Sequence, residues 1–220
     1  DGEWAYQAEV GYNFKKKTPL GGRYGMNIKA NFSYVRAIDR QFYNTSDLIQ
    51  KTNGYESKFF KWGDDTYYRS FDLVLTRKLS KAFKISLMYV NQLYNQTVVE
   101  GHGGVVHTNI YIADAKYQFS PKVTLRGELQ YMTTKQDQGD WAYGLLELSL
   151  APNWMVSVSD MWNCGATNLH YYQGLVTYNI DQHRIQGGYG RTRAGYNCSG
   201  GVCRYVPATT GFTLSYNYNF

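Results

Sequence analysis

The sequence predicts an all-β protein, an antiparallel transmembrane β-barrel with about eleven strands visible. Aromatic residues make up 17% of the chain, and glycine is abundant at 22 residues while proline is scarce at 4. This composition favours strands over helices. Mean hydropathy is −0.50, and no stretch approaches the roughly 18 consecutive apolar residues that a spanning helix needs. A barrel strand has no such requirement, because only every second residue faces lipid.

The strands are predicted from stretches in which every second residue is apolar or aromatic. In residues 212–220 the even positions are all apolar or aromatic, and the odd positions are all Thr, Ser or Asn. The pattern recurs in ten further stretches, each close to the roughly 9–11 residues that cross a bilayer at a tilt. The predicted strands are 4–14, 24–34, 67–79, 83–94, 107–119, 123–131, 141–150, 154–162, 169–180, 183–194 and 212–220.

Aromatic residues tend to lie at the two ends of these apolar faces. Trp154 and Trp162 bracket two valines in 154–162, with Asp160 as an exception on the same face. Rings at both ends of an apolar band are typical of the two membrane–water interfaces. A soluble β-sandwich has no reason for such a band.

The connections between the strands alternate in length. Short turns on the periplasmic side and longer loops outside are the usual barrel arrangement. The short turns are 79–81, 120–122, 152–153 and 181–182, and a longer turn covers 15–22. The longer loops are about 37–66, 98–106, 135–140, 163–168 and 195–210.

An odd number of strands raises the question of how the barrel closes. Bacterial single-chain barrels normally have an even number of strands, and a closed barrel leaves no unpaired edge in lipid. We therefore expect residues 1–220 to form a single barrel domain that lacks N-terminal strands, the C-terminal part of a larger even-stranded barrel. The alternative is that one strand has been miscounted.

The end of the chain resembles known outer-membrane proteins. The sequence from Ser215 to Phe220 resembles the C-terminal β-signal of Gram-negative outer-membrane proteins, with Tyr216, Tyr218 and Phe220 as its aromatic positions. Residues 196–211 are similar to the end of a family of uncharacterised, longer Bacteroidota outer-membrane proteins. The resemblance implies a place in the bacterial outer membrane, contact with its lipid and lipopolysaccharide, and assembly by the barrel-assembly machinery. It implies no particular activity.

The candidate catalytic and metal-binding residues are few. The four histidines are His102, His107, His170 and His183, and no Gly-x-Ser-x-Gly or other nucleophile motif accompanies them. His102 and His107 lie in a Gly-rich stretch whose spacing misses that of known zinc motifs. We interpret these histidines as polar residues at the barrel rims. No catalytic, cofactor-binding or metal-binding residue is expected, and the protein is not expected to be an enzyme.

Two of the three cysteines are close together in the sequence. Cys198 and Cys203 flank a Gly-Gly pair that lets the chain double back. Because an exported protein passes through an oxidising periplasm, we predict a disulfide between them that staples an outer loop. Cys164 is then left as a free thiol.

Charged residues fall on the polar phase of the predicted strands. The formal charge is +6, but the basic residues are scattered in the sequence, which argues against nucleic-acid binding. A Lys or Arg facing lipid at mid-membrane costs about 2–4 kcal/mol, so these charges should face the barrel lumen. The predicted lumen charges are Glu9, Lys29, Asp72, Lys84, Lys116, Arg126, Glu128, Glu147 and Arg184. They can line a wet channel or pair as a plug, and the total strand number decides which.

Two functions are consistent with this sequence. The first is a porin-like or transport-related channel. The alternative is a non-conducting structural or accessory barrel whose outer loops dock to other outer-membrane proteins in a larger complex. Aromatic residues of loop 37–66 fit such docking, and packing of the loop on the barrel mouth explains them equally well. They are Phe42, Tyr43, Tyr55, Phe59, Phe60 and Trp62.

Overall fold

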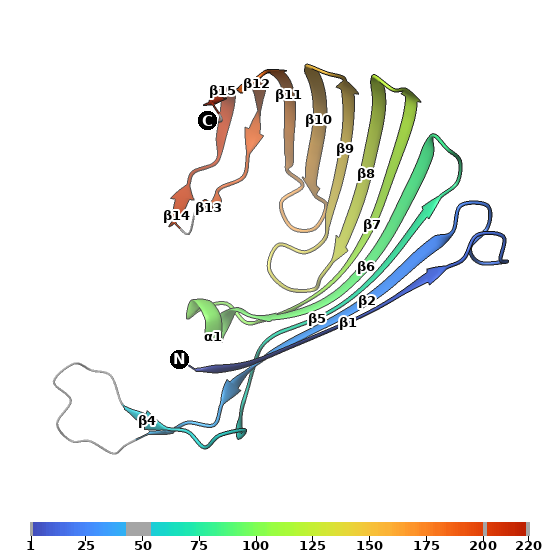
Figure 1. Ribbon diagram of the computed structural model, residues 1–220. Helices are drawn as coiled ribbons and strands as arrows, with labels where there is room; N and C mark the ends of the chain where they lie inside the picture. The colour runs from blue at the N-terminus through green and yellow to red at the C-terminus, as the bar shows by residue number, and fades with distance from the viewer. Residues whose placement is uncertain (1, 43–53, 200–201, 219–220) are drawn as a thin grey trace.

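A curved antiparallel sheet of eleven strands dominates the computed structural model, which describes residues 2–42, 54–199 and 202–218 (Figure 1). The strands follow one another in chain order in the sheet, and each pairs with its neighbours, joined alternately by short turns and longer loops. The strands are β1 (Glu3–Phe14), β2 (Met26–Ile38), β5 (Trp62–Lys78), β6 (Phe83–Asn95), β7 (Val105–Ser120), β8 (Val123–Thr133), β9 (Trp141–Leu150), β10 (Trp154–Asn163), β11 (His170–Ile180), β12 (His183–Thr192) and β15 (Thr209–Tyr218).

The predicted fold class is confirmed: the protein is all-β and antiparallel, and its eleven main strands correspond one to one to the predicted ones. β1 and β15 form the two ends of the sheet. Within the described residues β1 pairs with β2 and with no other strand, and β15 pairs only with β12. The sheet is therefore open, with one free edge on each of its end strands.

The sequence prediction missed several small elements, all of which lie at the end of the sheet opposite the short turns (Figure 1). Two are short hairpins, β3 (Gln41–Phe42) with β4 (Tyr55–Glu56), and β13 (Gly195–Ser199) with β14 (Val202–Val206). The third is the helix α1 (Gln96–Glu100). It is too short for a periodicity to be seen in the sequence.

Caps at both ends hold α1 in place. The side chain of Asn95 accepts a hydrogen bond of 3.3 Å from the backbone N–H of Val98, and Gly101 ends the helix at a φ of 81°. An Asn cap and a left-handed glycine are the usual helix boundaries. No helix in the described part of the chain is long and apolar enough to span a membrane.

Two strand boundaries were predicted wrongly. β2 continues to Ile38 and β5 starts at Trp62, so the connection between them is shorter than the predicted loop 37–66. The register of this pair shifts on both sides of Arg36. Such irregularities break the alternation of apolar and polar residues, and this is why the sequence pattern ended too early here.

The register sorts side chains onto two faces of the sheet. On the apolar face, Leu125, Leu148, Val156 and Val176 follow one another across four strands. Many residues of this face are exposed, up to 88% for Phe212. On the opposite face, which we call the charged face, lie the buried side chains Ser70, Val90, Trp141, Asn163 and Thr177. Crowding of side chains on this face marks it as the concave one.

Candidate functional site

The charged face is the candidate site, since the nine predicted lumen charges all lie on it. The register places Glu9, Asn31 and Asp72 side by side on β1, β2 and β5. It aligns a second row across β6 to β9, and Arg184 lies on the same face of β12. The second row is Lys84, Lys116, Arg126 and Glu147. That this face lines a lumen stays a prediction.

A first polar cluster joins β1, β2 and β5. Lys29 Nζ lies 3.0 Å from Glu9 Oε1. Asn31 Nδ2 donates to Asp72 Oδ2 at 3.0 Å, and the hydroxyl of Ser70 donates to Asp72 Oδ1 at 2.5 Å. The two predicted acids of this cluster are therefore satisfied by neighbouring strands. Asn31 and Ser70 were not among the predicted site residues, because neutral polar side chains are common on the polar phase of every strand.

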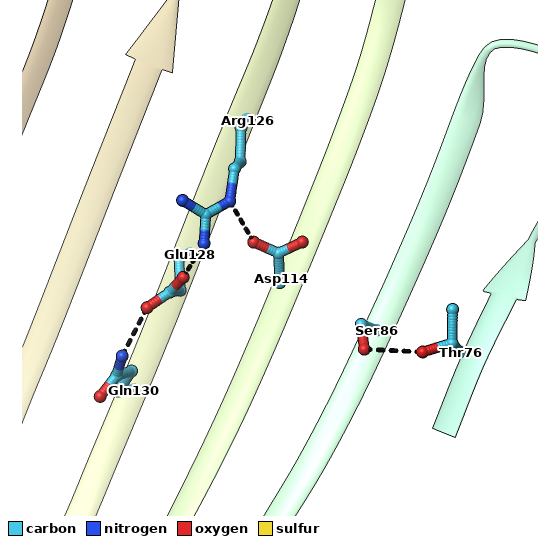
Figure 2. A network of polar contacts seen from close by, with 6 residues as sticks. All are labelled: Thr76, Ser86, Asp114, Arg126, Glu128 and Gln130. Atoms are coloured by element: carbon cyan, nitrogen blue, oxygen red, sulfur yellow. Dashed lines mark hydrogen bonds and ion pairs between the residues drawn. The ribbon is translucent and has the colours of Figure 1, made fainter. Parts of the chain in front are cut away.

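A second cluster is centred on Arg126, and its contacts cross from β8 to β7 (Figure 2). Arg126 Nε donates to Asp114 Oδ2 at 2.6 Å, while its Nη2 pairs with Glu128. Gln130 Nε2 donates to Glu128 from the other side. The guanidinium thus bridges two carboxylates in the donor geometry that suits it. Asp114 was missed in the sequence, although it lies two residues from Lys116 and so in the same phase.

A third group consists only of lysines. Lys78, Lys84 and Lys116 lie directly opposite one another on β5, β6 and β7, and we call them the lysine row. All three are exposed, and within the described residues none makes an ion pair. Like charges directly opposite each other destabilise a sheet, so the fold holds this row at a cost.

The charged face also contains an apolar area. Val74, Met88 and Ile112 face each other across β5, β6 and β7. Val90 and Ile110 adjoin them one step closer to the loop end. This area separates the lysine row from the loop end on these three strands. Because apolar residues occupy both faces here, the alternation of apolar and polar residues is less regular in 67–79, 83–94 and 107–119 than in 123–131 or 212–220.

Asp160 lies on the apolar face, as its place in the sequence indicated. Its Oδ2 is 2.6 Å from His170 Nδ1, and the ring of Trp162 stacks on that imidazole at 5.4 Å. The pair lies near the loop end of β10 and β11, where Trp162 and His170 are directly opposite. Asp160 is thereby paired with a histidine close to the end of the apolar band.

The other three histidines are dispersed. His102 Nε2 lies 3.7 Å from Glu100 Oε2 beside α1, and His183 Nδ1 is 2.7 Å from the hydroxyl of Tyr216. His107 lies at the start of β7. Among the described residues no group of three potential metal ligands comes together.

The structure tests the predictions about the cysteines and the C-terminal strand only in part. The backbone register places Cys198 opposite Cys203 in the β13–β14 hairpin, and the disulfide itself stays a prediction. Cys164 is a free thiol. The hydroxyl of Tyr218 donates to Gln182 Oε1 at 2.7 Å. Phe220 lies outside the described residues.

The loops at 135–140 and 163–168 are joined by the side chain of Asn163 and by two backbone hydrogen bonds, from Gly165 N–H to the Asp140 carbonyl and from Ala166 N–H to the Gln138 carbonyl. Asn163 is fully buried, and its Nδ2 donates to the carbonyl of Gln138 at 3.0 Å. Its Oδ1 accepts from the backbone N–H of Thr167 at 2.7 Å. Gly139 and Gly165 lie where these loops touch, and a Cβ on Gly165 would come within 2.8 Å of the Gly139 Cα.

Comparison with protein families gives a match over the whole chain. Residues 1–220 match the family of unknown function DUF6029. The chain belongs to this family. No curated protein sequence matches it.

Among solved structures, the DUF6029 chain is similar to the KdgM porin in complex with disordered oligogalacturonate. The two share 8% sequence identity over 100% of this chain and 99% of the porin chain, with a TM-score of 0.37. At that level the likeness carries no argument about function, which has to come from the two faces of the sheet.

The loop aromatics of this DUF6029 chain gather on the apolar face. Phe60 stacks on Trp4 with ring centroids 5.2 Å apart, Phe59 packs edge-on against Trp4 at 5.8 Å, and Trp62 contacts Tyr6 at 5.7 Å. We call these five residues the aromatic patch. Phe59 and Phe60 are still 82% and 66% exposed. Of the other loop aromatics, the Tyr55 hydroxyl accepts from the Gly2 N–H, while Tyr43 and the side chain of Phe42 lie outside the described parts.

Proposed function

We propose that the chain forms the wall of an outer-membrane β-barrel that acts as a porin-like channel. The observation that carries this proposal is the separation of the two faces: apolar residues are exposed on the convex face, and the nine predicted lumen charges, of both signs, lie on the concave one. A soluble protein would bury the apolar face instead.

The dimensions of the strands support a membrane span. The main strands have 10–17 residues. At about 3.3 Å per residue and a tilt of roughly 40°, even ten residues rise about 25 Å, the height of the apolar band of a barrel. Residues such as Val10, Leu129 and Leu214, which are 68–81% exposed, would then contact acyl chains. Glycines and alanines among them leave shallow grooves, which the chains would fill.

The free edges of β1 and β15 require partners in lipid. Unpaired backbone groups there cost several kcal/mol each, so we propose that strands beyond these eleven complete the barrel. A wider barrel leaves room for water between its walls. The mixed charges of the concave face would then line a hydrated pore for solutes.

The location is proposed from the separation of the two faces and from the resemblance of residues 196–211 and 215–220 to outer-membrane proteins. Such a barrel belongs in the outer membrane of a Gram-negative bacterium, here one of the Bacteroidota, with lipid and lipopolysaccharide around it. Tyr216, Tyr218 and Phe220 would present the β-signal to the barrel-assembly machinery, as the resemblance of the last strand implies.

Two adjacent leucines test the membrane span. Leu146 is on the apolar face and 50% exposed, while Leu145 is on the charged face of the same strand. Leu146→Lys would place an ammonium in lipid and cost about 2–4 kcal/mol, and we expect a marked loss of folded protein in the outer membrane. Leu145→Lys is the matched control and should assemble nearly normally. Equal assembly of both variants would mean that the apolar face does not meet lipid.

Conductance tests the channel itself. The purified full-length protein in a planar bilayer should give steady open-channel currents. A protein that assembles normally but stays silent would favour the second candidate, an accessory barrel within a larger complex. The observation that favours this candidate is the aromatic patch, because exposed aromatic side chains are typical of protein interfaces.

A further inference from the structure

The turn end of the sheet, from β1 to β8, holds an excess of positive charge. Segments 13–28, 73–86 and 115–127 contain eleven of the chain's 23 Lys and Arg residues and no Asp or Glu at all. In the sequence they are far apart. The sheet brings them together, because they form the turn ends of β1, β2, β5, β6, β7 and β8.

The lysine row lies at the centre of this region. Lys78, Lys84 and Lys116 occupy neighbouring strands, which are about 4.8 Å apart, so their Cα atoms span about 10 Å. The acidic residues that lie nearest to the row in the strand register face Arg126 and not the row lysines. Asp114 binds Arg126 at 2.6 Å, and Glu147 faces Arg126 across β8 and β9.

Two hollows adjoin the row on the charged face. One, of about 260 Å³, is lined by all three row lysines together with Lys81, Ser80 and Gln118. The other, of about 430 Å³, is lined by Lys78, Lys84, Lys15 and Lys16, with Asn13, Asn27 and Thr76 as neutral hydrogen-bonding groups. Both are open enough to admit a small solute and have no acidic residue in their lining.

We propose that the lysine row and these hollows form a binding site for soluble polyvalent anions. Ammonium groups at this spacing suit a ligand with several negative charges a few ångströms apart, such as linked phosphates or carboxylates. Binding relieves the repulsion between the lysines, which is why the fold tolerates them in this position. The inference rests on the proposed function only for its consequence, a channel that prefers anionic solutes.

Anion binding can be measured without any channel activity. The full-length protein in nanodiscs of phosphatidylcholine is titrated calorimetrically with sodium triphosphate and, separately, with citrate, at low ionic strength. We expect saturable binding of at least one of them that weakens steeply with added NaCl, because exposed charges are screened. The two probes distinguish a preference for phosphate from one for carboxylate.

A charge-matched pair of double variants locates the site. Lys84→Gln with Lys116→Gln should weaken binding by about tenfold, roughly threefold for each charge lost. Lys58→Gln with Lys135→Gln removes the same charge from the loop end, where both lysines are exposed, and should bind like the wild type. Circular dichroism of both variants in nanodiscs checks that they fold.

Three results would overturn the proposal: no binding of either probe, equal loss in both double variants, or loss of binding when phosphatidylglycerol is added to the nanodisc. The last would mean that the lysines contact lipid headgroups. The channel proposal is judged separately by conductance. A protein that binds triphosphate but does not conduct would refute the pore and support the anion site. A protein that conducts but binds neither anion would support the pore and refute the anion site.

Discussion

The Arg126 cluster and the lysine row lie next to each other on the same face, yet in the described part of the chain the charge of Arg126 is paired with carboxylates and the charges of the row are not. Arg126 is flanked by Asp114 and Glu128, each within ion-pair distance (Figure 2). Lys116, directly opposite Arg126 on β7, belongs to a row with no ion pair among the described residues. The difference teaches that one cluster ties strands together, whereas the other keeps its charge available to a ligand.

Loss of the Arg126 side chain should have the largest effect. Arg126→Met leaves Asp114 and Glu128 close together without their shared cation. Because these side chains are 13–35% exposed, solvent screens part of the repulsion, and we expect a loss of about 2 kcal/mol in the free energy of unfolding. Urea unfolding in detergent micelles, followed by tryptophan fluorescence, measures it. Arg126→Lys should lose less, and an unchanged midpoint for Arg126→Met would show that the cluster does not stabilise the sheet.

Removal of one of the two carboxylates that bind Arg126 should make its cluster more like the lysine row, with more positive charge available to a ligand. In Asp114→Asn the guanidinium keeps Glu128 but loses one counter-charge beside Lys116. We expect the affinity for triphosphate to rise about threefold, which corresponds to roughly 0.7 kcal/mol. Asp137→Asn is the matched control, since it removes one negative charge at the loop end from a residue with a φ of 54°, a conformation that asparagine accepts. A similar rise in affinity in both variants would mean that the effect comes from net charge alone.

The smallest expected effect is a gain in stability from the lysine row. Lys84→Met removes the central charge, which faces Lys78 on one side and Lys116 on the other. Relief of two like-charge contacts should raise the free energy of unfolding by about 0.5 kcal/mol at low salt, and the gain should vanish at high salt. Lys29→Met, which breaks an ion pair with Glu9, should instead lower it slightly. If Lys84→Met destabilises the protein, the lysines do not repel one another in the way proposed.

The sequence predicted the strands well because alternation is a local property. In 212–220 and 123–131 every position agrees with a two-residue period, and β15 and β8 follow it. It failed where one residue breaks that period, as at the irregularity beside Arg36. Elements held by a few contacts, such as α1 with its Asn95 cap, leave no periodic signal at all.

The grouping of charges could not be predicted from the sequence. A strand's phase shows which face a residue occupies, but its neighbours on that face depend on register, which turn length and bulges set. The lysines at 78, 84 and 116 looked scattered, and only the pairing of β5, β6 and β7 makes them a row. In the same way, Arg126 was predicted to be a lumen charge, while its partner Asp114 on the adjacent strand was missed.

The burial of Asn163 between two loops constrains how the length of either loop can change. Loops generally tolerate insertions and vary in sequence, and they can do so freely when they do not contact one another. Here the loops at 135–140 and 163–168 are held together by the Asn163 amide, by two backbone hydrogen bonds and by the close contact of two glycines. An insertion in either loop would pull the other out of place, so the two must change together or not at all.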